Sequence, residues 1–220
     1  MPSRYPPAGL KRAAVRIVSH PLVRRDLALL RSRSTPEPLF RELLEEISLF
    51  LAYEIARGLP MSKTSVRTPV GRAEGVRLQG EEPAVAAVLR AGLGMVGGVL
   101  KLFPRAKVGH IGLYRDPGTL RPVEYYRKLP PGLDRRLVIL ADPMLATGHS
   151  AAMAADILKE SGAKNIVLMC LVAAPEGVRT MRRAHPDISI TAAALDEKLN
   201  SHGYIVPGLG DAGDRLFGTL

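Results

Sequence analysis

The stretch Val138-Ile-Leu-Ala-Asp142-Pro-Met-Leu-Ala-Thr147-Gly148-His149-Ser150 decides how this chain folds. Its first four residues are apolar and predict a buried strand, and Asp142 stands where that strand ends. A turn of small residues follows, and residues 151–158 have the pattern of a helix. The backbone N–H groups and hydroxyls of such a turn, together with a helix N-terminus, favour an anion. The segment therefore predicts a phosphate cradle, with an ordinary threonine-capped turn as the alternative.

Strands and helices alternate on both sides of this stretch, from residue 83 onward. Short apolar segments rich in β-forming residues predict strands at 85–89, 108–114, 138–141, 166–172 and 188–194. Helical patterns lie between most of them, at 95–102, 150–161 and 175–184. This alternation predicts an α/β fold with a doubly wound, mostly parallel sheet, whose ligands bind at the carboxyl ends of the strands.

The remaining segments interrupt or precede this alternation. The long connection between 108–114 and 138–141 is expected to form an arm or lid over the site. Upstream, we expect two helices, at 20–33 and 36–56. A polar region of short strands and turns is expected to follow them at 57–82. Residues 1–19 are expected to be a flexible lead-in to a single domain, 20–220.

Composition narrows the class of protein. The chain has 220 residues, 46% of them hydrophobic and 24% charged, which suits one globular domain with a substantial core. No apolar run reaches the roughly 18 residues that a membrane helix needs, and the first residues lack the apolar segment of a secretory signal. The single cysteine, Cys170, lies in an apolar run and is expected to be a core residue. A reducing cytoplasm is the expected location.

The net charge of +10 is concentrated near the N-terminus, where residues 1–33 hold eight basic side chains against Asp26 alone. A basic segment of this kind can attract nucleic acid or anionic substrates. It can equally be a solvated surface, which is the interpretation we favour. Aromatic residues make up only 5% of the chain, and within the basic segment only Tyr5 could stack on a base. RNA binding is therefore disfavoured as a function.

Two glycine-rich strings need explanation. Gly92-Leu-Gly94-Met-Val-Gly97 fits the dinucleotide fingerprint, but so does Gly208-Leu-Gly210-Asp-Ala-Gly213, close to the end of the chain, so the match is weak. Glycine turns are better explained as places where the backbone approaches a ligand. Arg90 and Arg115 stand at consecutive predicted strand ends, and a guanidinium donates two hydrogen bonds to a phosphate. Together these features predict a polyanionic ligand.

Other catalytic patterns are missing from the sequence. It contains no Walker loop, no His-Glu-x-x-His and no Cys-x-x-Cys, and its five histidines lack the spacing of metal ligands. Gly148-His-Ser150-Ala-Ala152 lacks the second glycine of a nucleophile elbow.

From about residue 20 to the C-terminus, the chain resembles the type I phosphoribosyltransferases, and among them the uracil phosphoribosyltransferases. The most specific match is His202-Gly-Tyr-Ile-Val-Pro-Gly-Leu-Gly-Asp-Ala-Gly-Asp214, which resembles the uracil-binding hood of that family; we call residues 195–220 the hood. The other matching stretches are His20-Pro-Leu-Val, Leu89-Arg-Ala-Gly-Leu-Gly-Met95, Leu113-Tyr-Arg-Asp116, Tyr125-Tyr, Lys128-Leu-Pro, 142–148 and Ala173-Ala-Pro-Glu-Gly177.

The resemblance implies an enzyme of pyrimidine salvage. It would transfer the phosphoribosyl group of phosphoribosyl pyrophosphate (PRPP) to N1 of uracil, giving UMP and pyrophosphate. The implied cofactor is Mg2+ carried by PRPP, with a water-bridged contact to Asp211 as one way to hold it and no certain direct protein ligand. The implied assembly is a homo-oligomer, a dimer or a tetramer. The competing hypothesis is an RNA-binding regulator on the same fold, but such a regulator has no need of an intact hood string.

The resemblance also assigns residues to roles. The implied catalytic residues are Asp142 and Arg90. The implied PRPP-binding residues are Arg90, Arg115, Asp142, Pro143, Met144, Leu145, Ala146, Thr147, Gly148, His149, Ser150 and Asp211. The implied uracil-binding residues are Ile205, Gly210, Asp211 and Ala212.

Two residues depart from the patterns of related loops. Pro143 stands where many phosphoribosyltransferases have a second acid, which fits the uracil branch. His149 stands where the uracil branch has glycine, and we expect its side chain to point away from the phosphates. A histidine also tolerates a left-handed backbone better than most residues.

Overall fold

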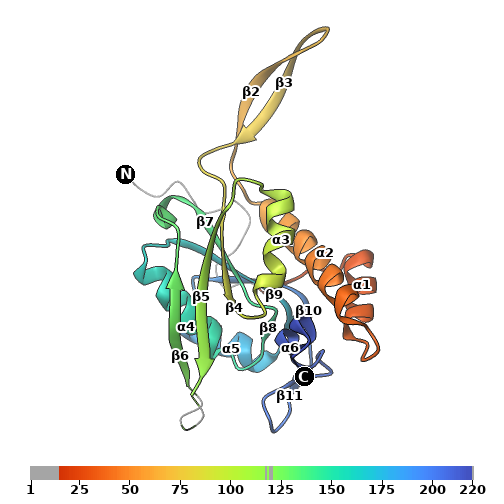
Figure 1. Ribbon diagram of the computed structural model, residues 1–220. Helices are drawn as coiled ribbons and strands as arrows, with labels where there is room; N and C mark the ends of the chain where they lie inside the picture. Colours follow the sequence, from red (N-terminus) through yellow and green to blue (C-terminus); the bar gives the residue numbers. More distant parts are fainter. Residues whose placement is uncertain (1–14, 117, 119–120, 220) are drawn as a thin grey trace.

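The computed structural model describes residues 15–116, 118 and 121–219, and its centre is one large sheet (Figure 1). Neighbouring strands pair in parallel throughout, except at the β5–β6 edge, so the predicted doubly wound α/β fold is confirmed. The strand order across the sheet is β1 (Val15–Ile17), β10 (Ser189–Leu195), β9 (Asn165–Ala173), β7 (Leu137–Ala141), β4 (Ala84–Leu89), β5 (Lys107–Arg115) and β6 (Pro122–Lys128), and the short β8 (Met144–Leu145) also pairs with β9.

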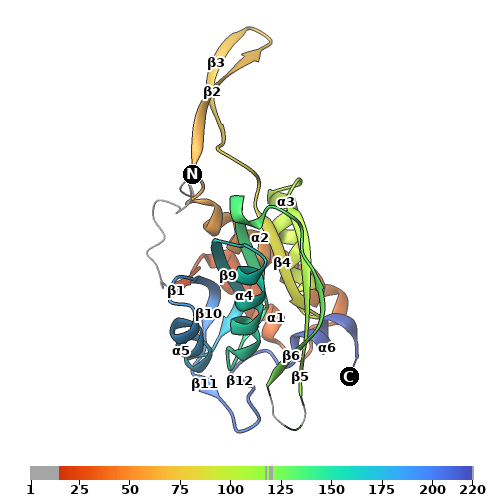
Figure 2. The same cartoon turned by 90° about the vertical axis from the view of Figure 1, so that its left-hand side faces the viewer.

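Helices cover both faces of this sheet (Figure 2). One face carries α1 (Pro21–Arg31), α2 (Glu37–Ala56) and α3 (Leu93–Leu102), and the other carries α4 (His149–Glu160) and α5 (Pro175–Ala184). Successive residues of β7 alternate between two cores, with Ile139 in the first and Val138 and Leu140 in the second. A strand buried on both faces reads as a continuous apolar run, which explains why β7 stood out in the sequence.

The N-terminal part differs from the expected lead-in. Residues 15–17, assigned to a flexible segment, form β1 and pair in parallel with β10 at the sheet edge. Helix α1 then begins at Pro21, where the missing N–H costs nothing, and the Nδ1 atom of His20 accepts a hydrogen bond from the Leu22 amide at 3.2 Å. Residues 1–14 of the predicted lead-in lie outside the described residues.

Residues 57–82 form one long hairpin instead of several short strands. Strands β2 (Met61–Thr68) and β3 (Gly71–Leu78) pair antiparallel along their whole lengths. The hairpin extends away from the body of the molecule (Figure 1).

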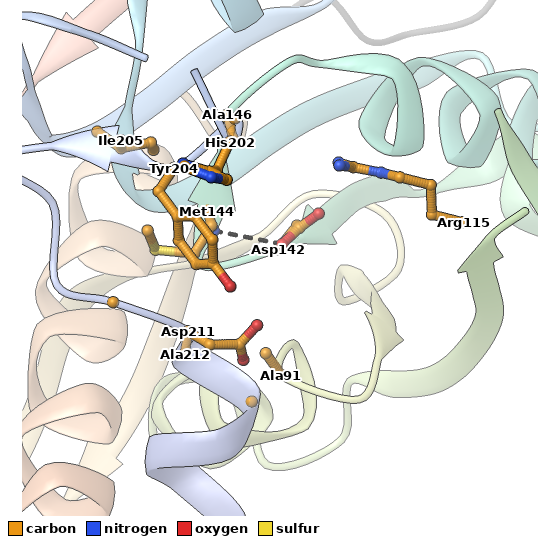
Figure 3. A pocket seen from close by; sticks show the side chains of 13 residues that line it. Ala91, Arg115, Asp142, Met144, Ala146, His202, Tyr204, Ile205, Asp211 and Ala212 are labelled. Atoms are coloured by element: carbon orange, nitrogen blue, oxygen red, sulfur yellow. Dashed lines mark hydrogen bonds between the residues drawn. The ribbon is translucent and has the colours of Figure 1, made fainter. Parts of the chain in front are cut away.

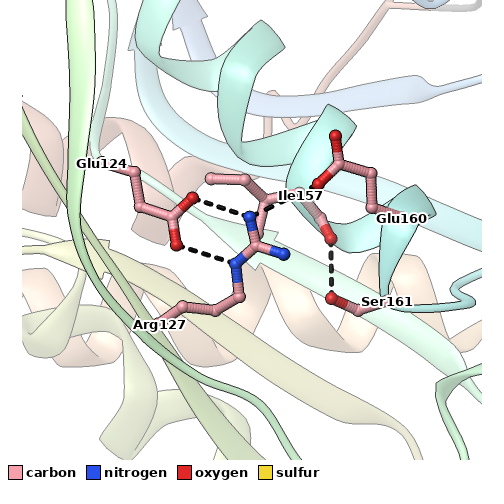
Figure 4. A network of polar contacts seen from close by, with 5 residues as sticks. All are labelled: Glu124, Arg127, Ile157, Glu160 and Ser161. Carbon is pink, nitrogen blue, oxygen red and sulfur yellow. Dashed lines mark hydrogen bonds and ion pairs between the residues drawn. The ribbon is translucent and has the colours of Figure 1, made fainter.

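The predicted arm between the strands at 108–114 and 138–141 is an extension of the sheet itself. Strand β6 pairs antiparallel with β5, and a 3-10 turn (Leu133–Arg135) leads on to β7. Arg127 fastens the arm to α4, because its guanidinium binds both carboxylate oxygens of Glu124, at 2.8 and 2.7 Å, and reaches Glu160 at 3.4 Å (Figure 4).

The C-terminal hood contains two short strands, β11 (Lys198–Leu199) and β12 (Ile205–Val206), and the helix α6 (Ala212–Phe217). Cys170 is fully buried in β9, as expected of a core residue, and burial raises the pKa of its thiol far above the usual range. No helix in the described ranges combines the length and apolar character needed to span a bilayer.

Candidate active site

The candidate site lies where three adjacent parallel strands end. Strand β4 pairs with both β5 and β7, so their carboxyl ends meet at one edge of the sheet. Arg90 follows β4, Arg115 ends β5 and Asp142 follows β7. A cavity of about 430 Å³ opens there, with strand ends on one side and the hood on the other (Figure 3). This is the position at which ligands bind in doubly wound sheets.

Asp142 is the carboxylate at the centre of this edge. Its Oδ1 atom accepts a hydrogen bond from the Met144 amide at 3.3 Å. Burial raises the pKa of Asp142 to about 6, and the hydrogen bond from Met144 opposes this rise only in part. A carboxylate whose ionised form is held in a poorly solvated place favours a nearby positive charge.

The phosphate loop, residues 142–150, is held by its packing against α5. Gly148 has a φ of +83°, and a Cβ there would lie 2.7 Å from the Gly177 carbonyl oxygen. A Cβ on Gly177 would in turn lie 2.6 Å from the carbonyl oxygens of Leu145 and Ala146. Only glycines allow the loop and the first turn of α5 to approach this closely. The loop then leads into the N-terminus of α4, which favours an anion.

A small cavity of about 60 Å³ lies directly inside the phosphate loop. Arg115 and Asp142 line it together with six of the seven predicted residues from 144 to 150, namely Met144, Leu145, Ala146, Thr147, Gly148 and Ser150. The residue left out of that run is His149. The loop therefore brings most of the predicted PRPP-binding residues around one point.

Two predicted members of the loop lie elsewhere. The Pro143 carbonyl accepts hydrogen bonds from the amides of Leu171 and Val172, at 3.0 and 3.1 Å, and the residue lines none of the cavities around Asp142. His149 is exposed and does not line the cavity inside the loop; it lines an adjoining cavity of about 750 Å³, to which Arg115 and Thr147 also contribute. The expectation that its side chain points away from the phosphates stays a prediction. Gly148 has the left-handed backbone conformation, whereas His149 is the first residue of α4. The tolerance of histidine for a left-handed backbone is therefore not needed at position 149.

Arg90 lines a second cavity, of about 540 Å³, that adjoins the first. Its guanidinium lies 3.1 Å from Oδ1 of Asp214 and 3.4 Å from the Thr219 hydroxyl, and it stands over the Phe217 ring. The Thr219 hydroxyl and then Arg90 lower the pKa of Asp214. Arg115 and Asp211 line this second cavity too, so Arg90 faces the same space as other predicted PRPP-binding residues.

The predicted uracil-binding residues come from the hood. Ile205 in β12 and the turn at Gly210, Asp211 and Ala212 line the cavity that also contains Asp142 (Figure 3). Oδ1 of Asp211 caps α6 by accepting from the Asp214 amide at 2.9 Å. The fold thus places the hood turn opposite the strand ends, although these segments are far apart in the sequence.

Sequence reasoning did not assign several residues that line the same cavities. They are Ala91, Tyr125, His202, Gly203, Tyr204 and Gly213. His202 and Tyr204 lie within the quoted hood string, so their position beside Ile205 was a usable signal. Tyr125 lies on the arm, and its presence in a stretch that matches the family was a usable signal too, although no role was assigned to it.

The site offers carboxylates to a metal but does not enclose one. Asp142 and Asp211 line the same cavity, yet the described residues contain no group of three potential metal ligands. Mg2+ commonly keeps several waters and binds through one or two carboxylates together with substrate phosphates. The residues present therefore fit a Mg2+ ion that arrives with a diphosphate.

Comparison with solved structures identifies the fold. The AQ2163 protein from Aquifex aeolicus matches with a TM-score of 0.87 and 35% sequence identity, covering 93% of this chain and 98% of that one. A hypoxanthine-guanine phosphoribosyltransferase from Bacillus anthracis, 15% identical, shares the fold with a TM-score of 0.50 over 73% of this chain and 80% of its own. The fold is that of the type I phosphoribosyltransferases.

Sequence comparison then identifies the family. The family model for uracil phosphoribosyltransferase matches residues 17–219. A uracil phosphoribosyltransferase from Geobacillus sp. (strain WCH70) is 57% identical over 205 residues, which is 93% of this chain and 98% of the relative. One from Dictyoglomus turgidum is 56% identical over 203 residues, covering 92% and 98%. The chain belongs to the uracil phosphoribosyltransferase family.

Proposed function

We propose that this protein transfers the phosphoribosyl group of PRPP to N1 of uracil, giving UMP and pyrophosphate, with the residue roles given below. One observation carries the proposal: the cavity inside the phosphate loop and the cavity lined by the hood turn at 210–212 share Arg115, Asp142, Met144 and Ala146. This arrangement supports a phosphate-binding half and a base-binding half on either side of the carbon that reacts.

The strand ends hold PRPP. The phosphate loop binds the 5′-phosphate through its amides and the N-terminus of α4, while Arg90 and Arg115 bind the diphosphate. As the C1–O bond breaks, its electron pair leaves with pyrophosphate, and negative charge grows on that group. Arginines already in place at that point stabilise the developing charge, the kind of preorganised electrostatics that contributes most to many enzymes. Arg90 exchanges its contact with Asp214 for the diphosphate.

Asp142 stabilises the ribose. Its ionised carboxylate favours the positive charge that C1 acquires as pyrophosphate departs. N1 of uracil then forms the new bond to C1, and the N1 proton passes to water or to the departing pyrophosphate. The raised pKa of Asp142 means that this carboxylate ionises close to neutral pH and becomes protonated below about pH 6.

The hood reads the base through its backbone. Uracil requires a donor facing O4 and an acceptor facing N3–H. The turn at 210–212 offers amide and carbonyl groups, and Ile205 supplies an apolar surface. Asp211 stands at the border between the two halves, where it faces PRPP and its metal.

Mg2+ is the proposed cofactor. When bound to the diphosphate it neutralises part of the charge of the leaving group. Asp142 and Asp211 would hold it through water, in keeping with the absence of a three-ligand cluster from the described residues.

The β2–β3 hairpin supports a homo-oligomer, a dimer or a tetramer. A two-stranded hairpin is marginally stable on its own, and this one extends into solvent with Val70 at its tip 98% exposed. One of its faces carries small uncharged pairs such as Val66 with Ala73 and Thr64 with Gly75, which suit contact with a second copy. Sedimentation of the full chain should give a dimer or larger, and a monomer at micromolar concentration would contradict this assembly.

The proposed setting is the cytoplasm, because the one cysteine is buried and no disulfide stabilises the chain. Two of the basic N-terminal residues in the part of the chain that the structure describes already have acidic partners, which does not favour a role in binding RNA. Arg31 forms a buried ion pair with Asp196, and Arg16 lies 3.8 Å from Glu54, so these charges are already compensated.

The experiment is an assay of UMP and pyrophosphate formation from uracil and PRPP. We expect both products in equal amounts, with formation depending on Mg2+ and lost when either substrate is left out. Failure to form UMP at saturating concentrations of both substrates and Mg2+ would overturn the proposal.

A further inference from the structure

The hood turn is held from behind by an ion pair that lines no part of the main cavity. Arg31 is the last residue of α1, and Asp196 follows β10. Both side chains are largely buried, with exposed fractions of 21% and 6%. Burying an ion pair costs desolvation free energy unless its donors and acceptors all form hydrogen bonds. The hydrogen bonds of this pair therefore show which part of the fold it stabilises.

The pair holds one residue of the hood by both of its backbone groups. The Arg31 guanidinium reaches the two carboxylate oxygens of Asp196 at 2.7 and 2.6 Å. Arg31 also donates to the Gly208 carbonyl at 2.7 Å, and Asp196 accepts from the Gly208 amide at 2.8 Å. Gly208 is thus fixed two residues before Gly210, where the turn that lines the cavity begins.

A second arginine holds the next carbonyl. Arg215 in α6 donates to the Leu209 carbonyl at 2.8 Å and to the Ser32 carbonyl at 2.6 Å, and its guanidinium lies 4.5 Å from the centre of the Phe40 ring. Successive carbonyls of the hood, at residues 208 and 209, are therefore tied to the end of α1. Gly208 also packs tightly against the backbone of Ile205, since a Cβ on Gly208 would lie 2.1 Å from the Ile205 carbonyl oxygen.

We propose that Arg31 and Asp196 are positioning residues that set base specificity, an inference that rests on the proposed uracil-binding role of the hood. Neither side chain lines the main cavity, so neither reads the base itself. By fixing Gly208, they fix the directions of the amides and carbonyls that follow it. A rigid turn pairs with uracil and leaves a group unpaired against cytosine, whereas a loose turn adapts to both.

The test is the variant Arg31→Lys, which keeps the positive charge but cannot contact both Asp196 oxygens and the Gly208 carbonyl in the same planar geometry. We expect the KM for uracil to rise about tenfold, because a charge-assisted hydrogen bond in a buried place is lost. The preference for uracil over cytosine should fall by a similar factor. The kcat and the KM for PRPP should stay within about twofold of the wild type.

The matched control is Arg136→Lys. Arg136 is also largely buried, donates to the Glu82 carbonyl at 2.8 Å and pairs with Glu81, but it directly precedes β7 and so lies at the amino ends of the strands, opposite the site. We expect it to lower the melting temperature without changing the KM for uracil. If both variants raised this KM equally, or if Arg31→Lys raised both KM values together or left base preference unchanged, the inference would be overturned.

Two further variants keep the test decisive. Arg215→Lys removes the contacts to the Leu209 and Ser32 carbonyls, and we expect it to raise the KM for uracil in the same selective way even if Arg31→Lys does not fold. Asp196→Asn should behave like Arg31→Lys, and the double variant should be no worse than either single one. A wild-type protein that forms no UMP would refute the proposed function, whereas an active wild type with non-selective variants would refute only the positioning role.

Discussion

The two halves of the site are built in different ways. The phosphate loop is local: β7, the loop and α4 follow one another without a break, and only the first turn of α5 is needed to support them. The hood is non-local, because Arg31, 165 residues away from Asp196 in the sequence, holds it in place. The first half can be read from a short window of sequence, whereas the second depends on contacts that exist only after the chain has folded.

The two halves also differ in the way they recognise their ligands. The strand ends present Arg90, Arg115 and a carboxylate, Asp142, whose pKa is raised to about 6 by burial. The hood lines the cavity with the backbone of the turn at 210–212 and with Ile205, together with His202, Tyr204 and Asp211. Charge suits a polyanion whose own charge changes during the reaction, and rigid backbone groups suit a small uncharged base.

The largest effect is expected for Asp142→Asn, which removes the charge from the phosphate-binding half. Turnover should fall by about 100-fold or more, because the cationic ribose loses its carboxylate. In the wild type, kcat/KM should fall as the pH drops through about 6, where Asp142 becomes protonated, and the Asn variant should lack this acidic limb. Steady-state rates from pH 5 to 8 measure both.

The thermal stability of the Asp142→Asn variant provides the control. Because the pKa of Asp142 is raised in the folded state, ionisation destabilises the fold as the pH rises from about 4 through 6, and the Asn variant escapes this loss. We therefore expect a melting temperature at pH 7 to 8 that is equal to or above that of the wild type. Wild-type turnover in the Asn variant would show that Asp142 only caps the end of its strand.

An intermediate effect is expected from a pair of glycine substitutions, one in each half. Gly148→Ala should raise the KM for PRPP and leave that for uracil nearly unchanged, because a Cβ meets the Gly177 carbonyl. Gly208→Ala should do the reverse, because a Cβ meets the Ile205 carbonyl. Shifts of about tenfold correspond to the roughly 1–3 kcal/mol that such strain costs.

Gly162→Ala is the matched control for this pair. Gly162 has a φ of +92°, but a Cβ there meets nothing within 4 Å. This variant should lose stability from backbone strain alone and keep both KM values. If either site variant shifted both KM values equally, the two halves could not be treated as separate.

The smallest effect is expected for His149→Gly, at the unusual position of the phosphate loop. The side chain is exposed and does not line the cavity inside the phosphate loop, so PRPP affinity should change by less than about twofold. Dissociation constants for PRPP at pH 5.5 and 8 provide the measurement. Affinity that weakens strongly with rising pH in the wild type, but not in the glycine variant, would place the imidazole on a phosphate.

Sequence alone predicted the parallel sheet because its strands are buried on both faces and appear as apolar runs. It did not predict the long β2–β3 hairpin, since a hairpin exposed on both sides has no hydrophobic alternation to detect. It also missed β1, whose three residues are too few for a pattern. The arm was recognised from its length, but its pairing with β5 needed the structure.

The residues of the candidate site also differ in how far the sequence could predict them. Asp142, Arg90 and Arg115 were found from their places at strand ends, whereas Ile205 and the turn at 210–212 came only from the family resemblance. Arg31 was grouped with solvated basic residues, and this was wrong, because the side chain is buried against Asp196. No local pattern distinguishes an arginine that will meet a distant carboxylate from one that will meet water.

We propose that the hood recognises uracil through fixed backbone groups, and the rates with uracil and with cytosine are the decisive comparison. Cytosine presents a donor at C4 and a bare acceptor at N3, the reverse of uracil, so at least one buried group would be left unpaired. We predict that kcat/KM with PRPP and Mg2+ favours uracil by a factor on the order of 10⁴. Comparable values for the two bases would contradict the account.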